Sequence, residues 1–595
     1  MGLKLATLTP KTTKAKGFFR EIEEVPSDHG AAGSGAAGSE EPALTATGML
    51  ERRWQHSEND VPGALAVLSW NLSAVNNNPF EYWLSYDDPR YLQLMMGVEY
   101  FLDDPGVDDV EVAEVFTDGM FQELMQHMAE EKMEGLDEVE AMWREGEMRF
   151  RERHIVTEVI KDKSLGAKRL ISMPDRVTNT INVVTRKESH YQPPPSCRPS
   201  VMNNFEGDLS TTDVWWEQWK KFMFQDSLTV RTATGIAIQR PVDMLEPIKK
   251  CKYPAVTEQE ERLSIPLQIL CQAIFDVIIV HLMNKLSPEN EWQVVKSTIC
   301  DRLFRNKHTR TLQILADRYS NIEVMCLQEV AAVFKDHFQA SALAETHKLV
   351  LPQMLDGKRD QNSVICLSQE AFVLDSITEV TNNVAACLKE GTKLAAGDLL
   401  AVKALTKDLK PWLIVSFHGD TNGLLTLPLV DAVATSLKEQ FGGHTLVLGM
   451  DANIYEQEKE GIQGFGGCIQ HLTGLGLTTC WGSEPQASAC RTTCSARTSL
   501  QPQLNKAVRY ADRVSKSGKE PKDLIVFRQE QLAPVSAAVM GPSRQPNPMK
   551  DNTGHLEYRE ETVFPTLDFP SDHGLLAVAL QPVPAATAIP GIPDS

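Results

Sequence analysis

The stretch PSDHGLLAVAL at residues 570–580 joins an Asp–His pair to a short apolar run. A run such as GLLAVAL, directly after the pair, is typical of a buried β-strand. The same tetrapeptide occurs at residues 26–35, in PSDHGAAGSG, where small and polar residues follow it. That composition cannot bury enough surface to fold, so a linker there would not hold Asp28 and His29 in a fixed geometry. We therefore expect the second copy, with His573, to carry the chemistry.

Comparable apolar runs recur along the chain, and several end in a polar residue. The runs are AVLSWNL (66–72), IEVMCLQEV (322–330), SVICLS (363–368), LLAVKAL (399–405), WLIVSFHG (412–419), TLVLGMDAN (445–453) and DLIVF (523–527). The polar residues at or near their carboxyl ends are Asn71, Glu329, His418, Asp451 and Asn453. Polar groups at strand ends can converge on one edge of a sheet, where α/β proteins commonly build sites.

The region between the first two runs has a different pattern. Apolar residues at three- and four-residue spacing predict an amphipathic helix over 116–150, and a tryptophan-rich helix at 214–224 follows a proline-rich break at 191–199. More helix is expected around 263–318. Its apolar stretch 268–283 contains Asp276 and His281 and is shorter than the roughly 20 residues a membrane span needs, so we interpret it as a buried helix.

Charge and cysteine content restrict the class of protein. The net charge is −21, and residues 101–150 alone hold 16 acidic and 3 basic side chains, whereas residues 491–528 hold 9 basic and 3 acidic ones. The eleven cysteines lack the spacing of a disulfide framework, which favours free thiols in a reducing compartment. The opening MGLKLATLTPKTTKAKG has no apolar run of the kind a secretory signal needs. We expect a cytoplasmic or nuclear protein that is not secreted and has no membrane span.

The order of these motifs resembles the endonuclease/exonuclease/phosphatase superfamily, which includes apurinic endonucleases, deadenylases, inositol polyphosphate phosphatases and neutral sphingomyelinases. The matching motifs are WN, QE, a strand-end His, DxN, an Asp at a late strand and a terminal SDH. The resemblance covers about 62–84 and 318–582. It implies a discontinuous two-sheet α/β sandwich, and the helical periodicity between its two parts predicts a mainly helical insertion at 85–317. Residues 1–48 and 583–595 are expected to be disordered.

The resemblance also implies a role for each matching residue. The metal ligands would be Glu329, Asn71 and Asp572; the catalytic residues Asp451, His573, Asp523 and His418; and the phosphate-binding residues Asn453, His418 and Asn422. The expected cofactor is Mg²⁺, with Mn²⁺ as an alternative, because hard cations prefer oxygen ligands. Asp451 would orient or deprotonate a water, and Asp523 would fix the tautomer of His573.

One departure narrows the resemblance. Ser73 stands where apurinic endonucleases have an Asp, which makes the site more like that of the deadenylases and inositol phosphatases. We expect a metal-dependent, nuclease-like phosphodiesterase. The alternatives are a phosphatase of a small phosphorylated molecule or lipid head group, and an inactive interaction module. The substrate would be nucleic acid or a phosphorylated small molecule, and the insertion could bind a partner protein.

Overall fold

The computed structural model describes the chain in ranges with gaps between them. The described residues are 54, 63–74, 78–146, 148–162, 198–232, 235–251, 253–254, 256–356, 359–501, 506–536 and 546–584. Apart from residues 583 and 584, the two segments expected to be disordered, 1–48 and 583–595, lie outside these ranges, and so do Asp28 and His29.

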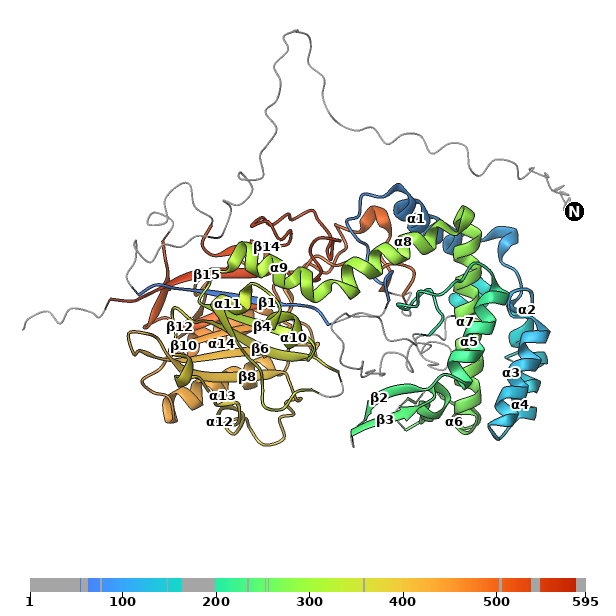
Figure 1. Cartoon of the computed structure of the whole chain (residues 1–595), viewed down its shortest axis with the longest axis horizontal. Helices are drawn as coiled ribbons and strands as arrows, with labels where there is room; N and C mark the ends of the chain where they lie inside the picture. Colours follow the sequence, from blue (N-terminus) through green and yellow to red (C-terminus); the bar gives the residue numbers. More distant parts are fainter. Residues whose placement is uncertain are drawn as a thin grey trace, which may run out of the picture. The chain divides into compact units, whose positions relative to one another are not determined.

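A seven-stranded sheet within the described ranges contains β1 and β15, the first and the last strand of the sandwich. Its order is β13–β15–β1–β4–β6–β5, with β14 also paired to β15. Figure 1 labels β1, β4, β6, β14 and β15 of this sheet. The strands are β1 (Leu65–Asn71), β4 (Val324–Val330), β5 (His347–Val350), β6 (Asn362–Ser368), β13 (Leu532–Pro534), β14 (Met549–Asp551) and β15 (Leu575–Pro582). Parallel pairing of β1 with β4 sets Asn71 beside Gln328. The first two motifs therefore meet at one end of this sheet.

A second sheet in the described part of the chain has six strands in the order β11–β12–β10–β9–β8–β7. The strands are β7 (Thr378–Glu379), β8 (Leu399–Leu405), β9 (Pro411–His418), β10 (Thr445–Asp451), β11 (Leu477–Thr479) and β12 (Asp523–Arg528). Register sets Asp451 beside His418 on the parallel neighbour β9, and beside Asp523 on the antiparallel neighbour β12. Three of the predicted site residues are thus adjacent across three strands.

The two sheets pack face to face, and helices cover their outer faces. Alternate strand residues explain the layers, because successive side chains in a strand point to opposite faces. On β1, Val67 belongs to the core between the sheets, whereas Leu68 belongs to the core on the outer face. Since strands in such a sandwich are buried on both faces, they have continuous apolar runs. All eight predicted strands are present, and the two-sheet α/β sandwich is confirmed.

Six α-helices in the described ranges lie next to the sandwich strands in the sequence, the first of them, α9, at the end of 85–317. They are α9 (Lys307–Tyr319), α10 (Phe334–Gln339), α11 (Leu343–Thr346), α12 (Thr381–Ala385), α13 (Thr426–Glu439) and α14 (Phe465–Gly474). Apolar residues of α13 and α14, such as Leu429 and Phe465, pack with Leu448 on the outer face of the six-stranded sheet. Leu315 of α9 belongs to the core on the outer face of the seven-stranded sheet.

The described residues within 85–317 are mainly helical, as the sequence predicts. The elements are α1 (Pro89–Asp103), α2 (Val112–Val115), α3 (Asp118–Glu130), α4 (Leu136–Arg144), the π-helical η4 (Ile155–Ile160), α5 (Thr212–Phe224), the hairpin β2 (Leu228–Thr232) and β3 (Gly235–Gln239), α6 (Glu258–Arg262), α7 (Ser264–Leu286), α8 (Glu291–Cys300) and the π-helical η7 (Asp301–Arg305). The periodic stretch 116–150 forms two helices, because Gly135 adopts a positive φ of 75° between α3 and α4.

Helix α7 is the one described helix whose length and composition would allow a membrane span, and 89% of its apolar window is buried inside the protein. Its buried residues include Asp276, which accepts hydrogen bonds from Ser200 and Trp219 and pairs with Arg198. A carboxylate with these three partners is compatible with burial in a protein core. The prediction of a buried helix is confirmed.

Candidate active site

The two sheets are joined at their motif edges by the side chain of Asn71. Its Nδ2 donates a hydrogen bond to Asp451 Oδ2 at 2.8 Å and to Glu329 Oε1 at 3.1 Å. Its Oδ1 accepts one from the backbone N–H of Ser73 at 2.7 Å, which fixes the orientation of the amide. Asn71 is fully buried. One amide thus holds the two carboxylates together at the end of β1.

Glu329 is presented by an irregularity in β4. The pairing of β4 with β6 shifts register between Leu327 and Val330, and Glu329 has a φ of 53°. Such a conformation is strained for a residue with a side chain and is common at functional sites. Glu329 Oε2 accepts a hydrogen bond from the backbone N–H of Ala74 at 2.7 Å. Burial opposes ionisation, but the hydrogen bond and charge of His418, with the Ala74 and Asn71 donors, hold the Glu329 pKa well below its usual range.

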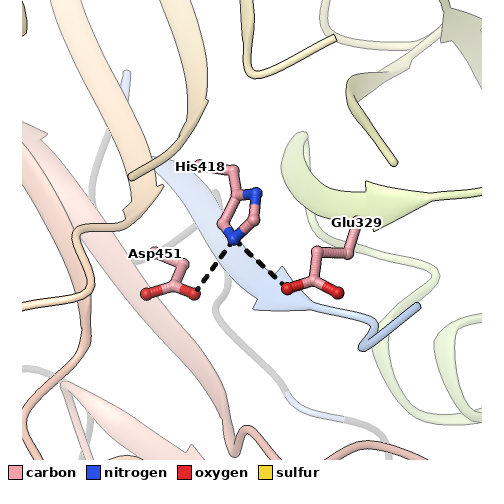
Figure 2. A group of neighbouring side chains, drawn as sticks. All are labelled: Glu329, His418 and Asp451. Atoms are coloured by element: carbon pink, nitrogen blue, oxygen red, sulfur yellow. Dashed lines mark ion pairs between the residues drawn. The ribbon is translucent and has the colours of Figure 1, made fainter. Parts of the chain in front are cut away.

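His418 lies between the two acidic residues, as Figure 2 shows. Its Nε2 is 3.2 Å from Glu329 Oε1 and 3.8 Å from Asp451 Oδ2, and its Nδ1 is 3.8 Å from Asp398 Oδ1. Burial alone would lower the His418 pKa, but these carboxylates raise it to about 10. In the absence of a metal ion, His418 is therefore a cation that offsets the charge of the carboxylates.

The histidine of the terminal SDH motif is held by Asp523. His573 Nδ1 lies 2.9 Å from Asp523 Oδ2, which also accepts a hydrogen bond from Thr492 Oγ1 at 2.6 Å. With Nδ1–H directed at Asp523, Nε2 faces Asp451 Oδ2 at 3.7 Å. Burial opposes protonation, yet the charges of Asp523 and Asp451 raise the His573 pKa to about 10. The imidazolium can donate a hydrogen bond or a proton toward the centre of the site.

Asn453 is a further predicted site residue that contacts Asp451. It has a φ of 49°, and its backbone N–H donates to Asp451 Oδ1 at 2.8 Å. Its Nδ2 lies 3.1 Å from the carbonyl of Gly419 and 3.2 Å from Asp451 Oδ2. The ammonium of Lys522 donates to its Oδ1 at 2.6 Å. Its N–H groups therefore face the carboxylate of Asp451.

The donor atoms fit a divalent metal ion that prefers oxygen. Two groups of side chains have ligand atoms within 4.8 Å of one another, Glu329–His418–Asp451 and Asp451–Asp523–His573. Carboxylate oxygens from two strands, with an amide between them, are the ligand type that Mg²⁺ takes while it keeps several waters. The two acidic clusters suggest divalent metal binding, without distinguishing Mg²⁺ from other hard cations.

Two predicted residues lie less centrally. Asp572 belongs to neither group of clustered ligands among the described residues, although its charge acts on His573, Tyr82 and Lys307. Asn422 is exposed in the loop after β9, and its backbone carbonyl accepts from Gln463. The roles of Asp572 in metal binding and of Asn422 in phosphate binding stay predictions.

Four residues near the site were not found from the sequence. Asp398 pairs with His418, Thr492 with Asp523, Lys522 with Asn453, and buried Lys307 donates to the Ala74 carbonyl at 3.5 Å. Burial lowers the Lys307 pKa to about 8 against the charges of Asp572 and Glu329. A short motif around any of these four would be indistinguishable from ordinary surface sequence, so no sequence signal identifies them.

Comparisons with known proteins concern two different parts of the chain. Residues 109–297 match a family model described as a domain of unknown function, DUF8234. No curated protein matches the sequence. One similar solved structure is that of D. rerio TDP2 complexed with single strand DNA product, at 12% identity over 46% of this chain and 91% of that one, with a TM-score of 0.29. A second is an endonuclease/exonuclease/phosphatase from Bacteroides vulgatus, at 12% identity over 48% of this chain and 94% of that one, with a TM-score of 0.32. A third is the human Nocturnin catalytic domain with bound sulfate anion, at 14% identity over 46% of this chain and 86% of that one, with a TM-score of 0.29.

The family resemblance therefore depends on the chain's own features. Asn71, Glu329, Asp451 and His573 follow one another in the expected order, lie at strand ends and meet in one cluster. The paired sheets and the ordered site residues give this chain a two-sheet α/β sandwich whose candidate site lies at the strand ends.

Proposed function

We propose that this protein is a divalent-metal-dependent hydrolase of phosphate esters in which an activated water attacks phosphorus. The observation that carries the proposal is the set of contacts around Asp451. Asn71 Nδ2 donates to its Oδ2 at 2.8 Å, and His418 and His573 approach the same oxygen at 3.8 and 3.7 Å. A carboxylate held in this way can orient a water and accept its proton while neighbouring donors face the phosphoryl oxygens.

Each side chain has a defined part in that reaction. Asp451 accepts the proton of the water as the new oxygen–phosphorus bond forms and the ester oxygen leaves. His573, protonated and fixed by Asp523, directs its Nε2–H at a phosphoryl oxygen, and Asn453 Nδ2, which contacts Asp451 and the Gly419 carbonyl, turns one N–H to another. Donors already directed at the developing charge are usually the largest source of rate acceleration. No covalent intermediate is required.

The metal would be held by Glu329 and Asn71, with Asp572 as a further ligand, and it would neutralise charge on the phosphoryl and leaving groups. Mg²⁺ is our proposed cation and Mn²⁺ the alternative. Glu329 is ionised, so its carboxylate is available to the cation, whereas the Asn71 amide, whose Nδ2 faces Glu329 and whose Oδ1 accepts from Ser73, would have to turn over to present its oxygen.

We propose a nuclease-like phosphodiester substrate that is short or compact, or that a partner delivers. The local excess of basic residues in 491–528, which includes Lys522 beside Asn453, would attract a few phosphates. The excess of acidic residues in 101–150 would repel a long polyanion, whose binding depends on many phosphate contacts. A small-molecule or lipid head group phosphatase is the second candidate.

The domain organisation and cellular location are proposed on separate grounds. The match to one family model at 109–297 lies wholly within 85–317, which supports an insertion between the two sandwich segments. A cytoplasmic or nuclear location is supported by the cysteines, because all ten in the described part of the chain are free.

The proposed function is tested by a turnover screen of the full chain with Mg²⁺, Mn²⁺ or EDTA. Three substrate classes are offered: short DNA and RNA oligonucleotides, inositol phosphates and sphingomyelin. We expect metal-dependent hydrolysis of oligonucleotides. Hydrolysis of inositol phosphates or sphingomyelin alone would instead support the second candidate, and the absence of turnover on every substrate would refute the hydrolase.

A further inference from the structure

A lysine without a place in the family motifs contacts the site directly. Lys522 precedes Asp523 at the start of β12, and its Nζ donates to Asn453 Oδ1 at 2.6 Å. The same ammonium lies 4.7 Å from the centre of the Tyr455 ring. Lys522 is half-buried. A charged donor at 2.6 Å makes a strong hydrogen bond, and the aromatic ring adds a second attraction that holds the lysine in place.

Tyr455, whose ring contacts Lys522, is held in place by three hydrogen bonds, one from its side chain and two of its backbone. The Tyr455 hydroxyl donates to the carbonyl of Thr421 at 2.9 Å. Its backbone N–H donates to the carbonyl of Gln463 at 3.0 Å, and its carbonyl accepts from Phe465 at 2.7 Å. The lysine therefore lies against a fixed surface and has a defined position beside Asn453.

The hydrogen bonds of Asn453 allow one orientation of its amide. An ammonium group can only donate, so the atom facing Lys522 must be the carbonyl oxygen Oδ1. Nδ2 then faces two acceptors, the Gly419 carbonyl at 3.1 Å and Asp451 Oδ2 at 3.2 Å. A flipped amide would set its NH₂ group against the ammonium and its oxygen against two other oxygens. All three contacts would become repulsive, so Lys522 determines which way the amide points together with the Gly419 carbonyl and Asp451.

We infer that Lys522 is a positioning residue that holds the amide of Asn453 beside Asp451, from where Nδ2 can turn one N–H to the reacting phosphoryl group. The inference rests on the proposed function, in which Asn453 Nδ2 donates to a phosphoryl oxygen. Removal of the ammonium would take away the shortest of the three contacts and leave the amide held only by the Gly419 carbonyl and Asp451. A less firmly held amide would present its donor to the phosphate in a smaller fraction of the molecules.

A different role for Lys522 would give different kinetics. If its charge merely attracted an anionic substrate, removal would raise KM and leave kcat unchanged, and removal of any lysine in 491–528 would act similarly. If it contacted the phosphate directly, its effect would add to that of Asn453. If Lys522 acts only through Asn453, its substitution has no further effect once Asn453 is absent, because the effects of substituting two residues in contact are not additive.

The test is a double-mutant cycle on the full chain, with the substrate that the turnover screen identifies. The variants are Lys522→Met, Asn453→Ala and the double variant, with Lys522→Arg to restore a donor. Lys389→Met is the matched control, because Lys389 lies outside the basic stretch 491–528, pairs with Asp431 at 3.6 Å and is well exposed. Thermal unfolding of each variant shows whether the fold is retained.

We expect Lys522→Met to lower kcat by about tenfold with little change in KM, a smaller loss than the 10² or more for a deleted transition-state donor. The double variant should be no slower than Asn453→Ala, Lys522→Arg should recover most of the activity, and Lys389→Met should match wild type. Calorimetric binding of inorganic phosphate gives a readout without turnover. Lys522→Met should weaken that binding severalfold in the wild-type background and leave it unchanged in the Asn453→Ala background.

An unchanged kcat in Lys522→Met, or effects of Lys522→Met and Asn453→Ala that simply multiply, would overturn the inference while wild-type turnover upheld the proposed function. Wild-type protein without turnover on any substrate would refute the proposed function itself, and the positioning role with it. The two failures are therefore distinguishable from the wild-type measurement alone.

Discussion

Asn71 and Asp451 are 380 residues apart in the chain, and the Nδ2 of the first donates to Oδ2 of the second at 2.8 Å. The bond joins β1 of the seven-stranded sheet to β10 of the six-stranded sheet. Because Asn71 also contacts Glu329, one buried amide connects the residue that would activate water with the residue that would hold the metal. The packing of the two sheets is thus the structural basis of the site.

Glu329→Gln should abolish metal-dependent turnover and leave the fold intact. The substitution keeps the size of the side chain and removes the charge that a hard cation requires. Turnover with Mg²⁺ and thermal unfolding measure the two effects. Glu345→Gln, on the exposed face of α11, removes an equal charge away from the site and should behave as wild type. Full activity in Glu329→Gln would contradict the metal assignment.

A deletion and a substitution distinguish the roles of the two SDHG copies in turnover. Removal of residues 1–48 should spare turnover, because the described site is built from residues between Asn71 and His573. His573→Ala should lower kcat on the order of 10²-fold or more, as expected for loss of a donor to the transition state. A requirement for Asp28 and His29, measured in the same assay, would mean that the strand-end argument is wrong.

Much of the site follows from the sequence because its residues lie at strand ends. Asn71, His418 and Asp451 each end an apolar run, and pairing of the strands brings such residues to one edge. The run of apolar residues also predicts strands buried on both faces, so the sandwich could be predicted together with its site.

The remaining contacts depend on three-dimensional packing. The position of His418 between Glu329 and Asp451 could not be predicted, because it requires β4 of one sheet to face β9 of the other. Asp398 and Thr492 support the two histidines from segments with no recognisable motif. The break at Gly135 was missed because the apolar spacing of the two helices continues across it.

The charge on His573 should make the stability of metal-free protein depend on pH. Its folded pKa of about 10 lies above the ordinary value of 6.5. A raised pKa gives a stabilisation that is complete below about pH 6.5 and is lost as the pH rises through 10. In EDTA, the difference in Tm between wild type and His573→Gln should therefore shrink from pH 6 to pH 10. A variant of exposed His555 serves as control, and a difference that grows with pH would contradict the assignment.

The acidic segment 101–150 should make long nucleic acid a poor ligand. Repulsion of many phosphates at once outweighs the local attraction by 491–528, so we expect weak binding of long duplex with a shallow dependence on salt. A salt titration of binding to long duplex DNA and RNA measures this directly. Nanomolar affinity that falls steeply as salt increases would show that the acidic segment has no such effect.

The most direct test of the account is hydrolysis in ¹⁸O-labelled water, with the substrate identified in the screen. Attack of a water held by Asp451 predicts one ¹⁸O atom in the phosphoryl product, measured by mass spectrometry, in the presence of Mg²⁺ or Mn²⁺. EDTA should abolish formation of labelled product, and Asp451→Asn should do the same with the metal present. A product without ¹⁸O, or equal labelling in EDTA, would contradict metal-dependent hydrolysis by an activated water.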